Sequence, residues 1–469
     1  MPIIALSLSL LFSSYMVLRD VRGRRNLSAT IWIPTVLLLV LGSRPVSNWM
    51  SGGQGHDVVG LANEQESSPV DTLFYLAVLS SCLFVGWRRG FRWGRLLRDN
   101  AAIMLFYLYF ALSVFWSGDP TGSIKRLIKD FGLIVVAGVV FSEEAPLEAL
   151  RAIYIRCAYV LLPLSVVFIK WFPTYGRSYG FGGDMQFTGV TTQKNGLGEI
   201  TMIFTLFMIW DYLESRVAEK DRRAKRFPWE LAVMVFLAVW LMRISESKTA
   251  LVCTTLGFLL LWRKRLFASQ LANIMVLTGA LCLPFLVLFS QEFGDVIAPI
   301  LRALGRNPTF TGRTEIWQHI TLQTVNPIVG SGFWNFWGGP GALAINEAMH
   351  GQIPNAHNGY LDLYLDGGII GLTLLFAVLI VSGVRLSNFP RVSKELYYFQ
   401  RIRFSVLIIA IVYNLSETAY ARVSLIWFTT LLMIVDFRFA ERVVQPKRAK
   451  LKSSWRTDAS REAGTFVES

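Results

Sequence analysis

Long apolar blocks separated by short polar segments run through most of the chain. A helix needs about 20 apolar residues to cross the hydrocarbon core of a bilayer, and many of these blocks approach that length. The pattern predicts an all-α protein, a polytopic bundle of about 12–13 transmembrane helices. The predicted spans are residues 2–18, 28–44, 70–86, 100–116, 127–141, 152–171, 197–213, 230–244, 249–262, 271–290, 359–384, 404–418 and 423–437.

Lysine and arginine are concentrated in alternate connections between these spans. They are frequent in residues 19–25, 87–98, 214–228, 263–265 and 385–403, and again after residue 441. With thirteen spans, all of these segments lie on one side, which the positive-inside rule identifies as the cytoplasm. We therefore expect a multi-pass membrane protein whose N-terminus lies outside and whose C-terminus lies in the cytoplasm.

Two segments test this topology. Residues 142–150 should lie inside, yet they carry Glu143, Glu144 and Glu148. Acidic residues contribute little to orientation, so the prediction stands. The N-terminus lacks the basic segment of a secretory signal, so residues 2–18 are expected to be a retained first span.

The outer connections are short except for one. They are residues 45–69, 117–126, 172–196, 245–248, 291–358 and 419–422. Loop 291–358 is too long for a simple connector, and apolar residues at helical spacing predict short helices at 295–304 and 314–324. The predicted organisation is spans one to ten within 1–290, the large outer loop 291–358, spans eleven to thirteen within 359–444, and a disordered basic cytoplasmic tail at 445–469. The family resemblance described below implies that the outer side is the periplasm of a bacterium and the membrane its inner membrane.

Composition fits a membrane protein and narrows its chemistry. Hydrophobic residues make up 53% of the 469 residues and charged residues 17%, against about 25% charged residues in soluble domains. The net charge of +14 follows from the cytoplasmic cations, and no nucleic-acid motif, Walker loop, Rossmann glycine pattern or metal-ligand spacing is present. Asp362 and Asp366, four residues apart, are better explained as charge near a helix N-terminus than as a metal site. We expect no nucleic acid, nucleotide, cofactor or metal.

Two residues of the large loop are candidates for chemistry. His357 lies in Asn-Ala-His-Asn-Gly-Tyr at the start of span eleven, and histidine exchanges a proton near neutral pH. A solvated loop histidine or a helix cap would fit the same position. Arg313 offers the planar fork that binds diphosphate, although an ion pair with Glu315 or a cation–π contact with Trp317 would explain it equally well.

Further cations lie in two other outer loops. Lys248 occupies a very short turn between two apolar spans, where ordinary snorkelling is the alternative explanation. Arg177 and Lys194 lie in loop 172–196, whose glycines expose backbone N–H groups to anions and whose aromatic residues suit sugar rings. A flexible loop with turn chemistry would account for the same glycines.

Several segments of these loops share their order and spacing with a known family. They are Gly189–Gly198 with Asn195, Ser247-Lys248-Thr249-Ala250, Arg313-x-x-x-Trp317, Asn326-Pro327 with Gly330-x-Gly332, and His357-Asn358 with Gly367, Gly368 and Gly371. Together they resemble the O-antigen ligase/polymerase superfamily, which assembles bacterial cell-surface polysaccharides. The resemblance covers most of the chain. One departure is Lys248, where the family commonly has arginine, so the charge is kept but the bidentate geometry is lost.

The resemblance implies a glycosyltransferase whose donor is an oligosaccharide on undecaprenyl diphosphate, used at the periplasmic face. His357 would be the general base on the acceptor hydroxyl and Arg313 would stabilise the departing diphosphate, so these two are the predicted catalytic residues. Direct displacement would invert the anomeric centre without a metal. The lipid bilayer and other polysaccharide assembly and export proteins are the further partners expected. The residues expected to bind substrate are Lys248, Arg177, Lys194, Asn195 and Asn358.

The layout is most similar to polymerases of acidic exopolysaccharides of the succinoglycan type, which join repeat units. A ligase that moves finished glycan to another acceptor shares the loop motifs and differs in its acceptor. A transporter of lipid-linked oligosaccharide would place charges deep in the spans, whereas the notable cations here lie in outer loops. A further alternative is that the large loop is a docking surface for partner proteins, to which Phe333, Trp334 and Trp337 would contribute aromatic side chains.

Overall fold

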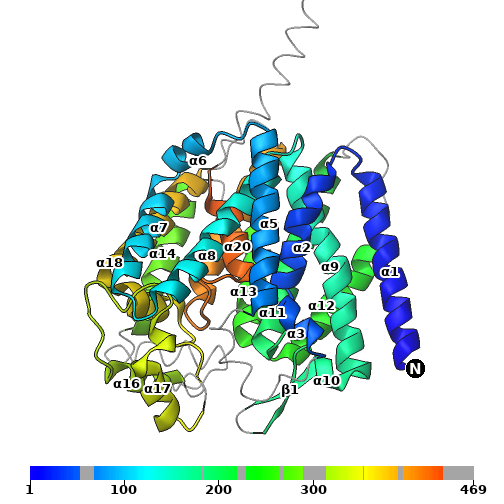
Figure 1. Cartoon of the computed structure of the whole chain (residues 1–469). Helices are drawn as coiled ribbons and strands as arrows, with labels where there is room; N and C mark the ends of the chain where they lie inside the picture. The colour runs from blue at the N-terminus through cyan, green and yellow to red at the C-terminus, as the bar shows by residue number, and fades with distance from the viewer. Residues whose placement is uncertain are drawn as a thin grey trace, which may run out of the picture.

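The protein is a polytopic bundle of helices, as its apolar blocks predict (Figure 1). The computed structural model describes residues 1–52, 68–180, 183–218, 229–262, 269–288, 313–351, 353–388 and 394–436. Each of the thirteen predicted spans overlaps a helix in this part of the chain. These helices are α1 (Pro2–Gly23), α2 (Trp32–Leu41), α5 (Pro69–Arg88), α7 (Ala101–Ser113), α8 (Pro120–Phe141), α9 (Pro146–Trp171), α11 (Lys194–Ala218), α12 (Trp229–Ser245), α13 (Lys248–Trp262), α14 (Gln270–Leu288), α18 (Gly359–Ser387), α19 (Lys394–Tyr413) and α20 (Leu425–Ile434).

Not all of these helices are long enough to cross a bilayer unaided. Among the described residues, six are sufficiently long and apolar, in α1, α5, α9, α11, α18 and α19. A seventh is the pair formed by α6 (Trp93–Asp99) and the helix that begins at Ala101, which meet at a bend of 97°. Since α2, α13, α14 and α20 are shorter apolar helices, the number of crossings stays a prediction.

The helices differ in how far the bundle covers them. In α9 and α19, 78% and 83% of the apolar window is buried inside the protein, against 17% in α1. Exposed leucines of α1, such as Leu8 and Leu11, therefore face the lipid rather than other helices. The helices α9 and α19 therefore form the interior of the bundle.

The short elements gather mostly at one end of the bundle, here named the loop end (Figure 1, lower edge). The short helix that the sequence predicted at 314–324 is confirmed as α16, whereas the one predicted at 295–304 lies outside the described residues. A two-stranded antiparallel hairpin pairs Arg177 with Phe187. The loop-end elements are α3 (Val46–Met50), α10 (Pro173–Gly176), β1 (Arg177–Tyr179), β2 (Met185–Phe187), α16 (Arg313–Thr321), η4 (Phe336–Gly338) and α17 (Pro340–Ala348).

The opposite end explains the acidic residues of segment 142–150. Glu143 is buried, and its Oε1 lies 2.6 Å from Nη2 of Arg89. The hydroxyls of Ser28 and Thr30 also donate to this oxygen, at 2.7 and 2.9 Å. Burial alone would raise the pKa of Glu143, but these partners outweigh it and hold the pKa below its usual value. Glu143 thus pairs with Arg89, one of the arginines of segment 87–98, and the orientation of the chain stays a prediction.

A kink in α18 joins the large loop to the bundle. Gly368 has φ 60° and ψ −162° inside the helix, so the N–H groups that follow lose their helical partners. The N–H of Ile369 donates to the carbonyl of Pro327 at 2.9 Å, and the N–H of Ile370 donates to that of Ile328 at 3.3 Å. In return, the N–H of Gly332 donates to the carbonyl of Asp366 at 2.9 Å. Residues 326–332, here named the docking segment, are therefore fixed against the kink.

Candidate active site

His357 lies in a constrained turn directly before α18. Its φ is +49°, a left-handed conformation that few side chains adopt. The side chain of Asn355 accepts the His357 N–H at 2.9 Å. Asn358 is the N-cap of α18 and accepts the N–H groups of Tyr360 and Leu361 at 3.0 and 3.2 Å. Asn355 and Asn358 thus fix the backbone on both sides of the histidine.

The turn is also held from two other elements. The Ala356 N–H donates to both carboxylate oxygens of Asp362, at 3.0 and 3.3 Å. Its carbonyl accepts Nε1 of Trp317, from α16, at 2.9 Å. Asp362 also accepts Nε1 of Trp337 at 2.7 Å and the Thr418 hydroxyl. These contacts give the Asp362 carboxylate a structural role. They also restrict the backbone of the turn that carries His357.

Glu417 is the point where three distant segments converge. Its Oε1 lies 2.8 Å from Nη2 of Arg313 and 2.9 Å from Nδ2 of Asn195. Its Oε2 lies 3.7 Å from Nδ1 of His357, a separation longer than a hydrogen bond. The structure therefore brings together three of the residues singled out in the sequence, around a fourth that was not.

The surroundings of Glu417 keep it ionised. Burial alone would raise its pKa, but the neighbouring His357 and the charge of Arg313 outweigh burial and hold the pKa below its usual value. Nδ1 of His357 is buried and has no hydrogen-bond partner among the described residues. A carboxylate beside Nδ1 stabilises an imidazolium, which leaves Nε2 as the nitrogen that takes a proton from outside.

The loop that carries Glu417 is built on Asn414. Its side-chain oxygen accepts the N–H groups of Ala419 and Tyr420, at 2.9 and 3.0 Å, so the chain reverses after α19. The Gly359 N–H donates to the carbonyls of Asn414 and Glu417, at 2.9 and 3.1 Å. A Cβ at Gly359 would lie 2.1 Å from the Asn414 oxygen. Only glycine permits this approach, which fixes Glu417 to the first residue of α18.

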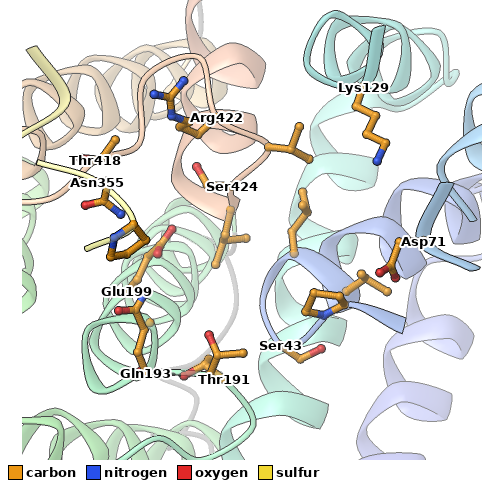
Figure 2. Close-up of a pocket in the computed structure, with 18 of the residues that line it drawn as sticks. Ser43, Asp71, Lys129, Thr191, Gln193, Glu199, Asn355, Thr418, Arg422 and Ser424 are labelled. Atoms are coloured by element: carbon orange, nitrogen blue, oxygen red, sulfur yellow. Dashed lines mark hydrogen bonds between the residues drawn. The ribbon is translucent and has the colours of Figure 1, made fainter. Parts of the chain in front are cut away.

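His357, Glu417, Arg313 and Asn195 are here named the cluster. A cavity of about 360 Å³ adjoins it (Figure 2). Asn355, which binds the His357 backbone, and Thr418, which follows Glu417, form one side of it. Gln193, just before α11, lies on the same side, and Glu199 points into the cavity from α11. An occupant of this cavity would therefore contact residues adjacent to the His357 and Glu417 cluster.

Comparison with known proteins finds one family profile and one relative that are similar to part of the chain. The profile of the family described as O-antigen ligase matches residues 231–376. The chain is also 24% identical over 290 residues to the exopolysaccharide production protein ExoQ of Rhizobium meliloti (strain 1021). Both matches support a relation to the O-antigen ligase/polymerase superfamily. The match to ExoQ covers 60% of this chain and 63% of ExoQ, so less than two thirds of the relative's length is spanned.

The superfamily match includes some cluster residues and leaves out others. Arg313 and His357 lie within residues 231–376, as does Lys248. Asn195 and Glu417 lie outside that range, before and after it. The cluster is thus completed by segments beyond the part of the chain that the family profile covers.

The Ser-Lys-Thr-Ala motif, residues 247–250, packs closely against two segments next to the cluster. Gly198 of α11 lies so close that a Cβ there would be 2.6 Å from Cβ of Ser247. The hydroxyl of Thr249 is 2.7 Å from that of Ser416, the neighbour of Glu417. Lys248, the first residue of α13, is exposed between these two contacts. The motif therefore places a cation beside the loop that carries Glu417.

Two other predicted substrate-binding cations have different positions. The Arg177 guanidinium donates to the Ile169 carbonyl at the end of α9, at 3.0 and 2.9 Å. It also lies over the Phe187 ring, 5.8 Å from the centroid, so it holds the hairpin and does not join the cluster. Lys194 is the first residue of α11, directly before Asn195. Their contact with substrate stays a prediction.

Sequence reasoning missed Glu417 and Arg44. Glu417 was placed at the end of a predicted span at 404–418, whereas α19 ends at Tyr413. Arg44, buried at the loop end, donates to the Thr191 carbonyl at 2.9 and 3.2 Å and so fastens loop 172–196 to α2. Burial lowers the Arg44 pKa to about 10. A polar residue next to a span end was the only signal available for either.

Proposed function

We propose that this chain is a membrane glycosyltransferase that polymerises undecaprenyl-diphosphate-linked oligosaccharide repeat units of an exopolysaccharide or O-antigen. The observation that carries the proposal is the convergence of His357, Glu417, Arg313 and Asn195 beside a cavity. A constrained histidine next to an ionised carboxylate is the arrangement of a general base. The similarity to the superfamily suggests the class of reaction.

The proposed reaction is a single displacement. Nε2 of His357 takes the proton of the acceptor hydroxyl while that oxygen forms a bond to the anomeric carbon of the donor. The bond from this carbon to the diphosphate oxygen breaks, and the diphosphate departs with the electron pair. The anomeric centre is inverted, and Glu417 stabilises the imidazolium that forms. No metal or nucleotide is required, because the diphosphate already activates the sugar.

The cations of the cluster have supporting tasks in this proposal. Nη2 of Arg313 is bound to Glu417, so Arg313 first positions the carboxylate. Its remaining N–H groups add positive charge beside His357, and Lys248 adds more from the adjacent turn. Asn195 contributes a second donor to the same carboxylate oxygen of Glu417.

We also propose the orientation that the basic segments indicate. The loop end would face the periplasm of a bacterium, with the N-terminus on that side. The basic connections and the C-terminal tail at 445–469 would lie in the cytoplasm. Lipid-linked oligosaccharide would then reach the cavity from the outer leaflet of the inner membrane.

The direct test is a reaction with one defined substrate. The purified full-length protein is incubated with undecaprenyl-diphosphate repeat units, without nucleotide or other protein, and the products are separated by size. We expect a ladder of multiples of the repeat unit. A single transfer that appears only when a different glycan acceptor is added would replace the polymerase with a ligase. The family description as O-antigen ligase favours this second candidate. Folded protein that gives no product with either acceptor would contradict both.

Substitution of Glu417 by glutamine is expected to lower the rate of transfer roughly 100-fold. Glutamine keeps an oxygen for Arg313 and Asn195 but removes the charge that stabilises the imidazolium. The matched control is Glu315→Gln, because Glu315 is exposed on the neighbouring α16. Initial rates of ladder formation provide the measurement, and equal rates for Glu417→Gln and the control would contradict the role of the carboxylate.

Because the pKa of Glu417 is lowered, we expect the effect of Glu417→Gln on the melting temperature to depend on pH. A carboxyl whose pKa is lowered by folding stabilises the protein above its unfolded pKa, which is about 4.3. That stabilisation is lost as the pH falls through the lower, folded pKa. The difference in melting temperature between the wild type and Glu417→Gln should therefore shrink as the pH falls below about 4. A difference that does not change with pH would show that Glu417 is not ionised in the folded protein.

A further inference from the structure

Large apolar side chains are exposed at the loop end, where α7, the docking segment and α18 meet. Phe115, in the short helix η2 (Val114–Trp116) that continues α7, is 86% exposed, and Ile328 in the docking segment is 57% exposed. Ile369 and Ile370, directly after the kink of α18, are exposed as well. Phe115, Ile328, Ile369 and Ile370 are here named the apolar patch. A surface in water rarely leaves several large apolar residues together, so the apolar patch calls for a partner.

Hydrogen bonds join the segments of the apolar patch into one surface. The carbonyls of the docking segment already bind the docking segment to the kink of α18. The carbonyl of Val329, next in the docking segment, accepts Nε1 of Trp116 at 3.3 Å and the Tyr109 hydroxyl at 3.1 Å. Trp116 directly follows Phe115, and its ring lies 6.0 Å from the Tyr109 ring. In Figure 1, α7 and α18 lie side by side at the left edge of the bundle.

The apolar patch continues the lipid-facing side of α7. Leu105, Leu108 and Leu112 are exposed and lie three and four residues apart, so they share one face of the helix. Phe115, three residues after Leu112, extends this face. The helix that begins at Ala101 belongs to a candidate membrane span. The apolar patch therefore lies where a face that contacts acyl chains reaches the edge of the membrane.

The backbone of the docking segment needs no water. Every N–H group in residues 327–332 has an acceptor among the described residues. Asn326 supplies its side-chain oxygen to two of them, at 2.9 and 3.2 Å, and its carbonyl to a third, at 2.9 Å. The N–H groups of Ser331 and Gly332 donate to carbonyls of α18, each at 2.9 Å, and Pro327 has no N–H. A loop beside acyl chains must satisfy its backbone in this way, whereas a loop in water need not.

We propose that the apolar patch inserts into the leaflet at the loop end, so that the docking segment anchors the large loop in lipid. Phe115, Ile328 and Ile369 contact the upper part of the acyl chains. The indole of Trp116 lies at the level of the headgroups, the depth that tryptophan favours in membranes. Trp334 follows the docking segment by two residues and lines the cavity, so the anchor holds the cavity at the membrane surface. This contact with lipid does not depend on the proposed reaction.

A partner protein is the other kind of occupant that an apolar surface could have. Lipid fits better, because the apolar patch is continuous with the exposed leucines of α7, which have no reason to be covered by a protein outside the membrane. The internal pairing of the docking segment also matches contact with acyl chains, which offer no hydrogen bonds.

The test measures the surroundings of single spin labels in the full-length protein in nanodiscs. Cys282→Ser removes the exposed native cysteine, and the other three cysteines are buried. Ile328→Cys then carries the label. Oxygen collides mainly with labels in lipid, whereas a water-soluble nickel chelate collides with labels in water. Leu108→Cys on α7 gives the lipid reference, and Glu347→Cys, at an exposed position of α17, gives the water reference.

We expect the ratio of oxygen to nickel collisions at residue 328 to lie near the value at residue 108 and severalfold above that at residue 347. Phe115→Cys should give the same result, so the conclusion does not rest on the folding of one variant. The matched control is Leu343→Cys on α17, because Leu343 is 63% exposed and apolar but lies outside the apolar patch. It should give the water value.

Two results would overturn the proposal. Water values at residues 328 and 115 would show that the apolar patch lies outside the membrane, which would leave it to a partner protein. Equal ratios at residues 328 and 343 would show that the docking segment is no closer to lipid than the rest of the large loop.

Discussion

Replacing His357 by asparagine is expected to slow glycan transfer by roughly 10²- to 10⁴-fold while the protein remains folded. The imidazole is the proposed base, and its Nδ1 lies 3.7 Å from the Glu417 carboxylate. Asparagine is preferred to alanine as the first variant, because it tolerates the left-handed backbone of residue 357 better than most residues. The turn beside Asp362 and Trp317 should therefore be retained.

The chain supplies a close control for this experiment. His350 is exposed, lies in the same large loop, and has φ +48°, almost the value of His357. His350→Asn therefore repeats the chemical change and the backbone demand without touching the cluster, and it should keep the wild-type rate. Ladder formation and binding of the lipid-linked repeat unit are measured for both variants. Unchanged ladder formation by His357→Asn at normal protein yield would remove His357 from the mechanism.

The fold could be predicted largely because hydrophobic length is a local property. The length and composition of an apolar block predict a helix without information on what packs against it. All thirteen predicted spans accordingly overlap helices. Span ends are less certain, since polar residues there can belong to either the helix or the loop. The end predicted at 418 shows the consequence, because Glu417 lies four residues beyond the last residue of α19, Tyr413.

The partners of the site residues could not be predicted, since they are distant in the sequence. The sequence offered Glu315 and Trp317 as neighbours of Arg313, yet Arg313 pairs with Glu417, 104 positions away. Trp317 instead donates to the Ala356 carbonyl and holds the histidine turn. The sequence alone could suggest His357, because a histidine can accept a proton wherever it lies. Glu417 could be recognised as its partner only in the folded structure.

Substitution of Gly368 by alanine is expected to have the largest effect on folding. At φ 60° and ψ −162°, Gly368 occupies a region of backbone conformation that is almost exclusive to glycine, and a side chain there costs about 1–3 kcal/mol. A Cβ would also lie 2.3 Å from the carbonyl of Ile328, which is backbone and cannot rotate away. The combined destabilisation should reach roughly 3 kcal/mol or more, a large share of the stability of a typical domain.

The damage should extend from the kink to both sides of the cavity. Without the kink, the N–H groups of Ile369 and Ile370 would lose the carbonyls of the docking segment. That segment leads directly to Trp334, and Asp366 beside the kink is the partner of Arg422. Variant protein that does fold should therefore melt at a lower temperature.

A glycine in an open position is the appropriate control. Gly279 lies within α14, and a Cβ there would meet nothing within 4 Å. Gly279→Ala should leave folding unharmed or stabilise the helix by roughly 0.5–1 kcal/mol. The yield of monodisperse protein and the melting temperature in detergent are compared for the two variants. Equal behaviour would mean that the docking segment is not tied to α18, and the position of Trp334 and Arg422 would then have no fixed support.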